Sequence, residues 1–188
     1  MDGKGREQLK SSRIAFTLKA WPVVALATIG LCYLTKTVAG WMGVDLPDQQ
    51  NVEVVRQCLA HAFASAKHFA VAALLVAQVV VLLPIIEELV FRGLLFKVAC
   101  KGAWKILPFD HSIIRPFDYS IIVFSSGLFS AAHYVFQPWP DSAFLALFFF
   151  GVAQCGIYRK TGRIWCAMLN HGLFNLTNLV LLFVLPEA

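Results

Sequence analysis

Residues 85–97 read IIEELVFRGLLFK and place two adjacent glutamates, Glu87 and Glu88, inside an apolar run that extends from Phe69 to Ala99. The chain has 11 acidic residues, and all the others lie in tails or in connections between apolar runs. Ionised carboxylates are costly inside a membrane, so acids found there are functional by default. This glutamate pair is the only acidic chemistry in the apolar part of the chain, and the rest of the sequence is interpreted around it.

Composition assigns the chain to the membrane proteins. Its 188 residues are 59% hydrophobic and 14% charged, whereas a soluble domain is about 45–50% apolar and about 25% charged. Several runs approach the roughly 20 apolar residues that a spanning helix needs. Backbone groups in lipid must be satisfied internally, which predicts an all-α, polytopic membrane helix bundle of five to six transmembrane helices. The five cysteines form no CxxC pair, and we expect them to be small buried hydrophobes.

The apolar runs give the predicted order of spans. Five spans are expected, at 14–38, 69–99, 119–136, 142–158 and 164–185. Segment 52–67 is expected to form an amphipathic helix at the surface, and a sixth, re-entrant piece in this region stays open. Pro84 lies inside the second run, where a proline removes a hydrogen bond and kinks the helix just before the glutamates. We therefore divide the single domain into an N-terminal part, 1–68, and a helix-bundle core, 69–188.

The basic residues indicate topology rather than a nucleic-acid surface, although the net charge is +5. With five spans, one side of the membrane holds the N-terminal tail and segments 97–118 and 159–163, with eleven Lys and Arg residues. The other side holds three, Lys36, Arg56 and Lys67. The positive-inside rule then predicts a cytoplasmic N-terminus.

Within the second run, Glu88 and Arg92 are four residues apart and share a helix face, so they can form an ion pair. Such a pair reduces the cost of burying Arg92 in a low dielectric. Adjacent helix residues point about 100° apart, so Glu87 faces elsewhere. Glu87 is therefore the carboxylate left to face a cavity as a general base.

Three more polar side chains lie in predicted spans. His133 lies near the end of the third, and His171 and Asn175 share a face of the last. A glutamate assisted by a histidine can deprotonate water, and a histidine with an asparagine can donate to an oxyanion. Zinc is the alternative, with Glu87, His133 and His171 as ligands and water in the fourth position. Residue types alone leave both open.

Three motifs together resemble the type II CAAX prenyl endopeptidase and bacteriocin-processing family, also called the Abi family of intramembrane proteases. Its pattern is Glu-Glu-x-x-x-Arg, then Phe-x-x-x-His, then His-x-x-x-Asn or Asp. This chain carries it at residues 87–92, 129–133 and 171–175. The resemblance implies a glutamate-dependent protease without a cofactor, in which Glu87 and His133 activate water, and His171 and Asn175 stabilise the oxyanion. Glu88 and Arg92 would support the helix and orient Glu87.

The resemblance also implies a substrate class. Family members act on prenylated CAAX tails in eukaryotes, and on leader peptides, bacteriocins or membrane-anchored sorting tails in bacteria. A chain this short, without extra domains, looks bacterial, so we expect a protein of the cytoplasmic membrane with lipid and a membrane-associated peptide as partners. No nucleic-acid partner is expected, and the sequence carries no signal for an oligomeric state.

Two other function classes stay open at this stage. A non-catalytic membrane scaffold or immunity protein of the same fold could keep the motifs as a polar core. A proton-coupled transporter also explains buried Glu and His side chains, although five spans without an inverted repeat are unlike the usual transporter architecture.

Overall fold

The computed structural model describes residues 3–47, 50–63, 69–96, 98, 116–135 and 141–184. Within these ranges the chain forms helices and no strands, which confirms the all-α prediction. The first two helices are α1 (Gly3–Trp41) and α2 (Gln50–Phe63). The next is a continuous rod made of α3 (Phe69–Ala77), η2 (Gln78–Leu82), α4 (Leu83–Glu88) and η3 (Leu89–Phe96). The last three are α6 (Pro116–Ala132), α7 (Phe144–Thr161) and α8 (Ile164–Val184).

The expected elements are all represented. Helix α1 begins ahead of the apolar run, because the polar residues before Ile14 continue the same helix. The predicted interfacial segment corresponds to α2, although residues 64–68 lie outside the described part. Most of the basic connection 97–118 also lies outside it.

Among the described residues, two helices are long and apolar enough to cross a membrane by length and composition, Glu7–Trp41 and Phe69–Phe96. Helix α8 has 21 residues and is apolar apart from its three asparagines, His171 and Thr177. Large apolar side chains point outward along the two long helices: Leu26 is 73% exposed and Leu74 is 70% exposed. Exposed apolar surface of this extent is typical of a membrane-facing protein.

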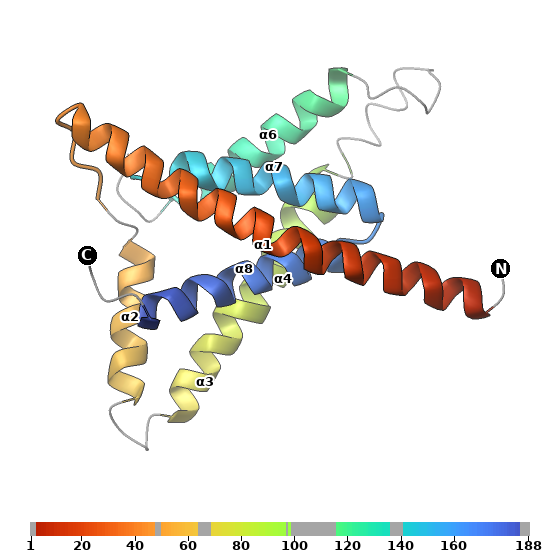
Figure 1. Cartoon of the computed structure of the whole chain (residues 1–188), viewed down its shortest axis with the longest axis horizontal. Coiled ribbons are helices and arrows are strands. Elements are labelled where there is room, and N and C mark those ends of the chain that lie inside the picture. The colour runs from red at the N-terminus through yellow and green to blue at the C-terminus, as the bar shows by residue number, and fades with distance from the viewer. Residues whose placement is uncertain are drawn as a thin grey trace.

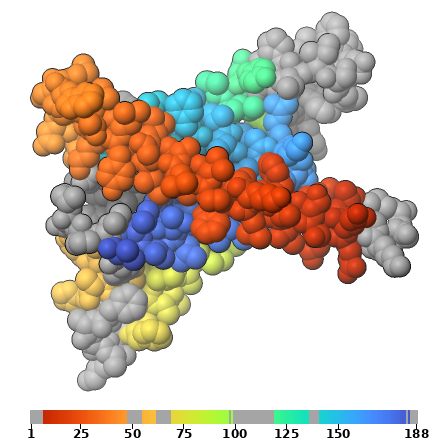
Figure 2. Space-filling model, in the orientation of Figure 1, coloured from red at the N-terminus to blue at the C-terminus, as the bar shows by residue number. Residues whose placement is uncertain are grey.

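The helices form a bundle in which α8 has neighbours on two sides. Helix α1 crosses over α7 and α8 and contacts both (Figures 1 and 2). The Trp21 indole N–H donates to Thr177 Oγ1 at 3.0 Å, which links α1 to α8. The rod α3–η3 packs on α8 as well, and α6 pairs with α7. The core between them is aromatic, with Phe129 and Phe150 fully buried.

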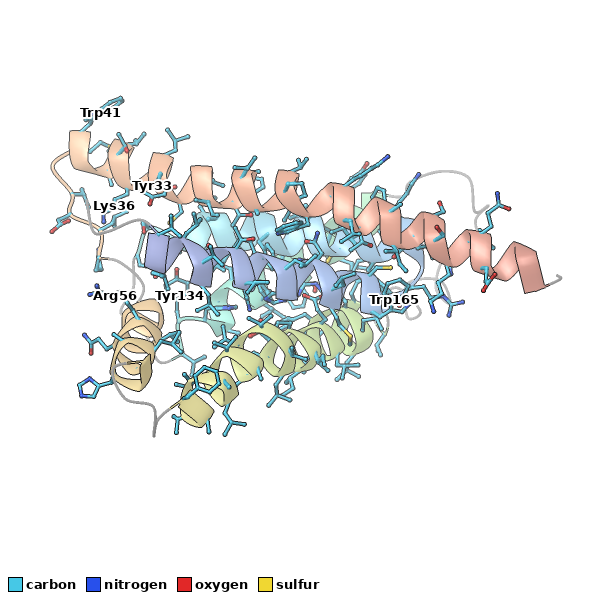
Figure 3. All side chains as sticks on the ribbon, turned by 60° about the horizontal axis from the view of Figure 1, so that its bottom comes forward. Tyr33, Lys36, Trp41, Arg56, Tyr134 and Trp165 are labelled. Atoms are coloured by element: carbon cyan, nitrogen blue, oxygen red, sulfur yellow. The ribbon has the colours of Figure 1, made fainter. Side chains whose placement is uncertain are left out.

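The two ends of the bundle separate as the charge count predicts. The first residues of α1, the end of α7 and the beginning of α8 lie toward one end (Figure 1). Lys36 and Arg56 lie at the opposite end, near Tyr134 (Figure 3). Gly162 joins α7 to α8 in the left-handed conformation, at φ 64°, which favours glycine at a helix C-terminus. This arrangement agrees with the predicted alternation, whereas the cytoplasmic N-terminus stays a prediction.

Candidate active site

Helix α4 delivers the two glutamates to different surroundings. Glu88 is fully buried, and its Oε1 lies 3.1 Å from Arg92 Nη1, so the ion pair expected from their spacing is present. Arg92 Nη2 also donates to the Gly151 carbonyl of α7 at 3.1 Å. The guanidinium lies 4.6 Å from the centre of the Phe129 ring, which is a favourable cation–π distance. The side chain of Glu87 is 24% exposed.

Helix α8 inserts His171 between the two carboxylates. Its Nδ1 lies 2.9 Å from Glu88 Oε1, and its Nε2 lies 3.7 Å from Glu87 Oε2. An ionised carboxylate only accepts hydrogen bonds, so the Nδ1–H donates to Glu88 and the Nε2 edge is turned toward Glu87. The Phe150 and Phe129 rings pack edge-on against the imidazole at 4.9 and 6.0 Å. We call Glu87, Glu88, Arg92 and His171 the glutamate–histidine cluster.

A wide turn before Pro84 holds α8 against the rod. The Leu83 N–H donates five residues back, to the Gln78 carbonyl. The next bond of that pattern would reach Val79, but residue 84 is a proline and has no N–H. Asn175 Nδ2 donates to the Val79 carbonyl instead, at 2.9 Å. The side-chain amide of α8 thereby replaces the missing backbone donor of the rod.

Gly172 allows this approach. A Cβ atom added at Gly172 would lie 2.5 Å from the Val80 carbonyl oxygen, closer than non-bonded atoms come. Gly172 directly follows His171, so the contact between α8 and the rod fixes the height of His171 beside the glutamates. Asn175 is predicted to donate to an oxyanion. In the structure, one of its two amide hydrogens is used in the hydrogen bond to the Val79 carbonyl.

His133 is a predicted site residue whose contacts in the described part of the chain run to Phe129 rather than to the cluster. It directly follows α6, and its Nδ1 lies 2.9 Å from the Phe129 carbonyl oxygen. Its ring packs on Phe129 at 4.8 Å, and the same Phe129 ring contacts His171. Phe129 therefore separates the two imidazoles and positions both. The end of α6 therefore reaches α8 through the Phe129 ring.

A second buried polar pair lies beside the cluster. Gln154 Nε2 on α7 donates to Asn170 Oδ1 on α8 at 3.1 Å, and both side chains are fully buried. Within the described residues, Gln154 Oε1, Asn170 Nδ2 and Glu87 Oε2 have no hydrogen-bond partner. Gln154 has no role predicted from the sequence. Its signal was a single amide side chain inside the apolar run 142–158.

Zinc is the predicted alternative for Glu87, His133 and His171. Across the described ranges, no three His, Cys, Asp or Glu side chains are grouped closely enough to hold an ion. Glu87 and His171 lie together, whereas His133 packs on Phe129, which also contacts His171, and whether the protein uses a metal stays a prediction.

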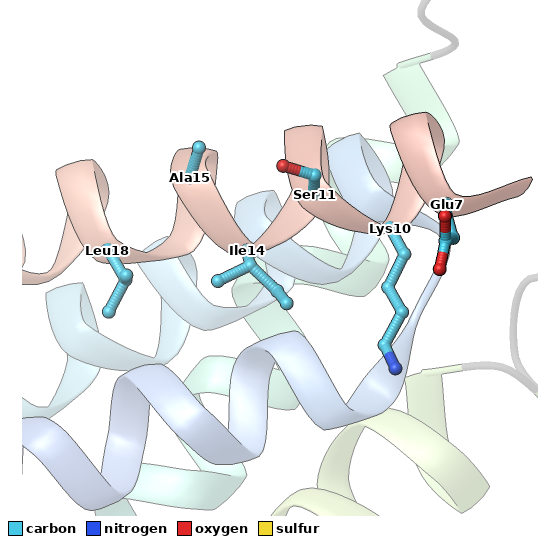
Figure 4. Close-up of a pocket in the computed structure, with 6 residues that line it drawn as sticks. All are labelled: Glu7, Lys10, Ser11, Ile14, Ala15 and Leu18. Atoms are coloured by element: carbon cyan, nitrogen blue, oxygen red, sulfur yellow. The ribbon is translucent and has the colours of Figure 1, made fainter. Parts of the chain in front are cut away.

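An open groove runs beside the first half of α1, away from these residues. It is lined by Glu7, Lys10, Ser11, Ile14, Ala15 and Leu18, and Lys10 extends from it toward the beginning of α8 (Figure 4). No residue of the glutamate–histidine cluster lines it.

Comparison with known proteins gives one match. Residues 56–177 match the family model described as type II CAAX prenyl endopeptidase Rce1-like. The matched range contains all three motifs. Neither the curated proteins nor the solved structures give a match.

Proposed function

This chain belongs to the Rce1-like family of type II CAAX prenyl endopeptidases, and from this premise we propose that it hydrolyses a peptide bond of a membrane-associated substrate with Glu87 as the general base. At the level of the family, the chain is an integral membrane protein and a CAAX-type intramembrane protease. The proposal adds the residues, the mechanism and the substrate class.

The observation that carries the proposal is the position of His171 between two glutamates of unequal burial. Glu88 is fully buried and bonded to both Arg92 and His171. Glu87 is partly exposed, and its Oε2 has no hydrogen-bond partner among the described residues. The 3.7 Å between Glu87 Oε2 and His171 Nε2 exceeds a direct hydrogen bond. An oxygen atom of water or substrate that lies beside both groups can hydrogen-bond to Glu87 Oε2 and to His171 Nε2 at once.

The proposed reaction follows from these contacts. Glu87 removes a proton from water, and the water oxygen attacks the scissile carbonyl carbon. The carbonyl oxygen becomes an oxyanion, which accepts hydrogen bonds from protonated His171 Nε2 and from the second amide hydrogen of Asn175. The C–N bond then breaks, and Glu87 passes the proton to the leaving amine. The products are a carboxylic acid and an amine.

The charges of the cluster suit this role for His171. When both of its ring nitrogens carry protons, His171 and Arg92 contribute two positive charges against the two negative charges of Glu87 and Glu88. A buried group of charges is tolerated when it is paired and hydrogen-bonded. His133, across Phe129, is proposed to assist Glu87 in holding the water.

The proposed substrate is a leader peptide, bacteriocin or C-terminal sorting tail in a bacterial cytoplasmic membrane. The family description instead names prenyl CAAX substrates. The test must therefore include both classes.

The test is cleavage by the full chain in detergent, with a farnesylated CAAX-tailed peptide and a set of unprenylated membrane-anchored peptides. Wild type is compared with Glu87→Ala and Glu87→Gln, each with and without a strong zinc chelator. We expect Glu87→Ala to lose about 10²- to 10⁴-fold in kcat, the usual contribution of a general base, and the chelator to change nothing.

Equal cleavage by wild type and Glu87→Ala would exclude the mechanism. Loss with the chelator, restored by added zinc, would make Glu87 and the histidines metal ligands. Cleavage of the farnesylated peptide alone would replace the bacterial substrate class with the prenylated one.

A further inference from the structure

A set of hydrogen bonds that involves none of the Glu, Arg, His or Asn residues of the three motifs joins the end of α6 to the beginning of α7. We call Ser130, Tyr134, Asp141 and Phe144 the α6–α7 corner. The Ser130 hydroxyl donates to the Phe144 carbonyl at 2.7 Å. The Tyr134 hydroxyl donates to Asp141 Oδ1 in a short hydrogen bond. The Tyr134 and Phe144 rings pack at 5.4 Å.

Asp141 fixes the α7 side of this corner. Its Oδ1 accepts the backbone N–H groups of Ala143 at 2.8 Å and Phe144 at 3.2 Å. These are unsatisfied donors at the first turn of a helix, and an aspartate is a preferred partner for them. Asp141 is only 5% exposed. Its carboxylate therefore has a defined position, and the phenol of Tyr134 is attached to it.

His133 is the residue immediately before this attachment. The backbone there leaves the α-helical pattern, since the His133 and Tyr134 N–H groups donate three residues back, to Ser130 and Ala131. No further turn of α6 follows to hold the His133 ring. Its ring contacts Phe129, and the next residue of the chain, Tyr134, is bonded to Asp141.

We propose that Tyr134 and Asp141 are positioning residues that hold His133 in its catalytic orientation. The inference rests on the proposed function, in which His133 assists Glu87. The phenol–carboxylate bond fixes the chain directly after His133. With the chain fixed, the imidazole stays on Phe129 with its Nδ1 at the Phe129 carbonyl, and its Nε2 edge is left for the water.

The donor in this bond is stable to pH. Burial, followed by the hydrogen bond to Asp141, raises the pKa of the Tyr134 phenol. Tyr134 lies in the turn after α6 and stays protonated throughout the neutral range, so the bond to Asp141 keeps its donor there.

The test removes the hydroxyl and keeps the ring. Tyr134→Phe preserves the packing on Phe144, and Asp141→Asn preserves an acceptor oxygen, whereas Asp141→Ala removes it. With whichever peptide wild type cleaves, we expect kcat to fall about tenfold in Tyr134→Phe and Asp141→Ala, with KM unchanged. Asp141→Asn is expected to retain most of kcat. In a His133→Ala background, Tyr134→Phe is expected to lower kcat no further, because residues that act as a unit are not additive.

Thr177→Val is the matched control, because it removes a hydroxyl that binds another helix far along the sequence from His133. It is expected to leave kcat unchanged. A second readout needs no substrate: nitrogen NMR of labelled histidine, with His133 assigned from His133→Gln. Wild type should show a protonated Nδ1, and Tyr134→Phe should show exchange between tautomers.

An unchanged kcat or an unchanged His133 signal in Tyr134→Phe would overturn the inference, as would a further fall in kcat in the His133→Ala background. These outcomes are separate from failure of the proposed function, which shows in Glu87→Ala. If Glu87→Ala is inactive and Tyr134→Phe cleaves like wild type, the protease stands and the positioning role does not.

Discussion

The glutamate–histidine cluster contains His171, the α6–α7 corner adjoins His133, and the two are built differently. The cluster joins four ionisable side chains, with Glu88 and Arg92 fully buried. In the corner, the Asp141 carboxylate accepts from the Tyr134 phenol and from backbone N–H groups, while the Ser130 hydroxyl donates separately to the Phe144 carbonyl. In the cluster, each charge depends on its partners, since a buried charge without compensation is costly. In the corner, the neutral Ser130 bond contributes about 1 kcal/mol, and a bond to the charged Asp141 about 1.5–3 kcal/mol. A single substitution should therefore cause a large loss of stability in the cluster and a small one in the corner.

The sharpest test of this difference is Arg92→Leu. It leaves Glu88 with His171 alone, and breaking one side of a buried pair typically costs about 3–5 kcal/mol. We expect a loss of that size in the free energy of unfolding, measured by chemical unfolding in detergent, with activity lost as well. Arg163→Leu is the control, because Arg163 is exposed and surface changes usually stay within about 0.5 kcal/mol. A loss below about 1 kcal/mol in Arg92→Leu would show that the cluster is not organised by charge compensation.

Gly172→Ala tests the packing that sets the height of His171. The added methyl would lie 2.5 Å from the Val80 carbonyl oxygen, and forcing extra volume into a packed site costs about 1–3 kcal/mol. Helix α8 must shift, so we also expect cleavage to fall. Gly156→Ala on α7 has no atom within 4 Å of the added methyl and should gain about 0.5–1 kcal/mol from helix propensity. Equal stability of the two variants would mean that α8 can move away from the rod at no cost.

The Asn175 contact gives a smaller effect with a defined dependence on Pro84. Asn175→Leu leaves the Val79 carbonyl without its donor, and we expect a loss of about 1–2 kcal/mol. Pro84→Ala restores a backbone N–H that can reach Val79, so in that background the same change should cost clearly less. Thermal unfolding of the four proteins gives the coupling energy. Asn178→Leu, on the same helix, should cost the same with or without Pro84. If the losses for Asn175→Leu and Pro84→Ala were additive, the Asn175 amide would not be compensating for the missing N–H of Pro84.

What the sequence could predict follows from the distances along the chain. The Glu88–Arg92 pair was predictable because a helix brings residues four apart together, and both lie in one uninterrupted apolar run. The bond between His171 and Glu88 joins residues 83 positions apart, so a pattern within one helix could indicate only that each needed a partner. Pro84 predicted a missing donor. It did not predict that a wide turn would form or that Asn175 would supply the hydrogen.

The corner was beyond sequence reasoning for a different reason. Asp141 lies in a connection, where an acid is ordinarily solvated, and it was grouped with the tails. Its burial depends on the N–H groups of a helix that begins at Phe144, on Tyr134 from the preceding helix, and on how closely the two helices meet. No spacing rule connects these residues. His133 and Phe129 are predictable because both belong to a motif, whereas Tyr134 and Asp141, which are proposed to hold the chain after His133, belong to none.

Ser130→Ala is expected to have the smallest effect. It removes one neutral hydrogen bond, from the Ser130 hydroxyl to the Phe144 carbonyl, and should cost about 0.5–1.5 kcal/mol in unfolding free energy. Cleavage should fall less than in Tyr134→Phe, because the phenol and Asp141 still fix the chain after His133. If Ser130→Ala instead destabilised the protein as much as Arg92→Leu, the bonds of the corner would act as one cooperative network. The prediction that the corner loses stability one bond at a time would then be wrong. The α6–α7 corner and the glutamate–histidine cluster would both depend on all their bonds together.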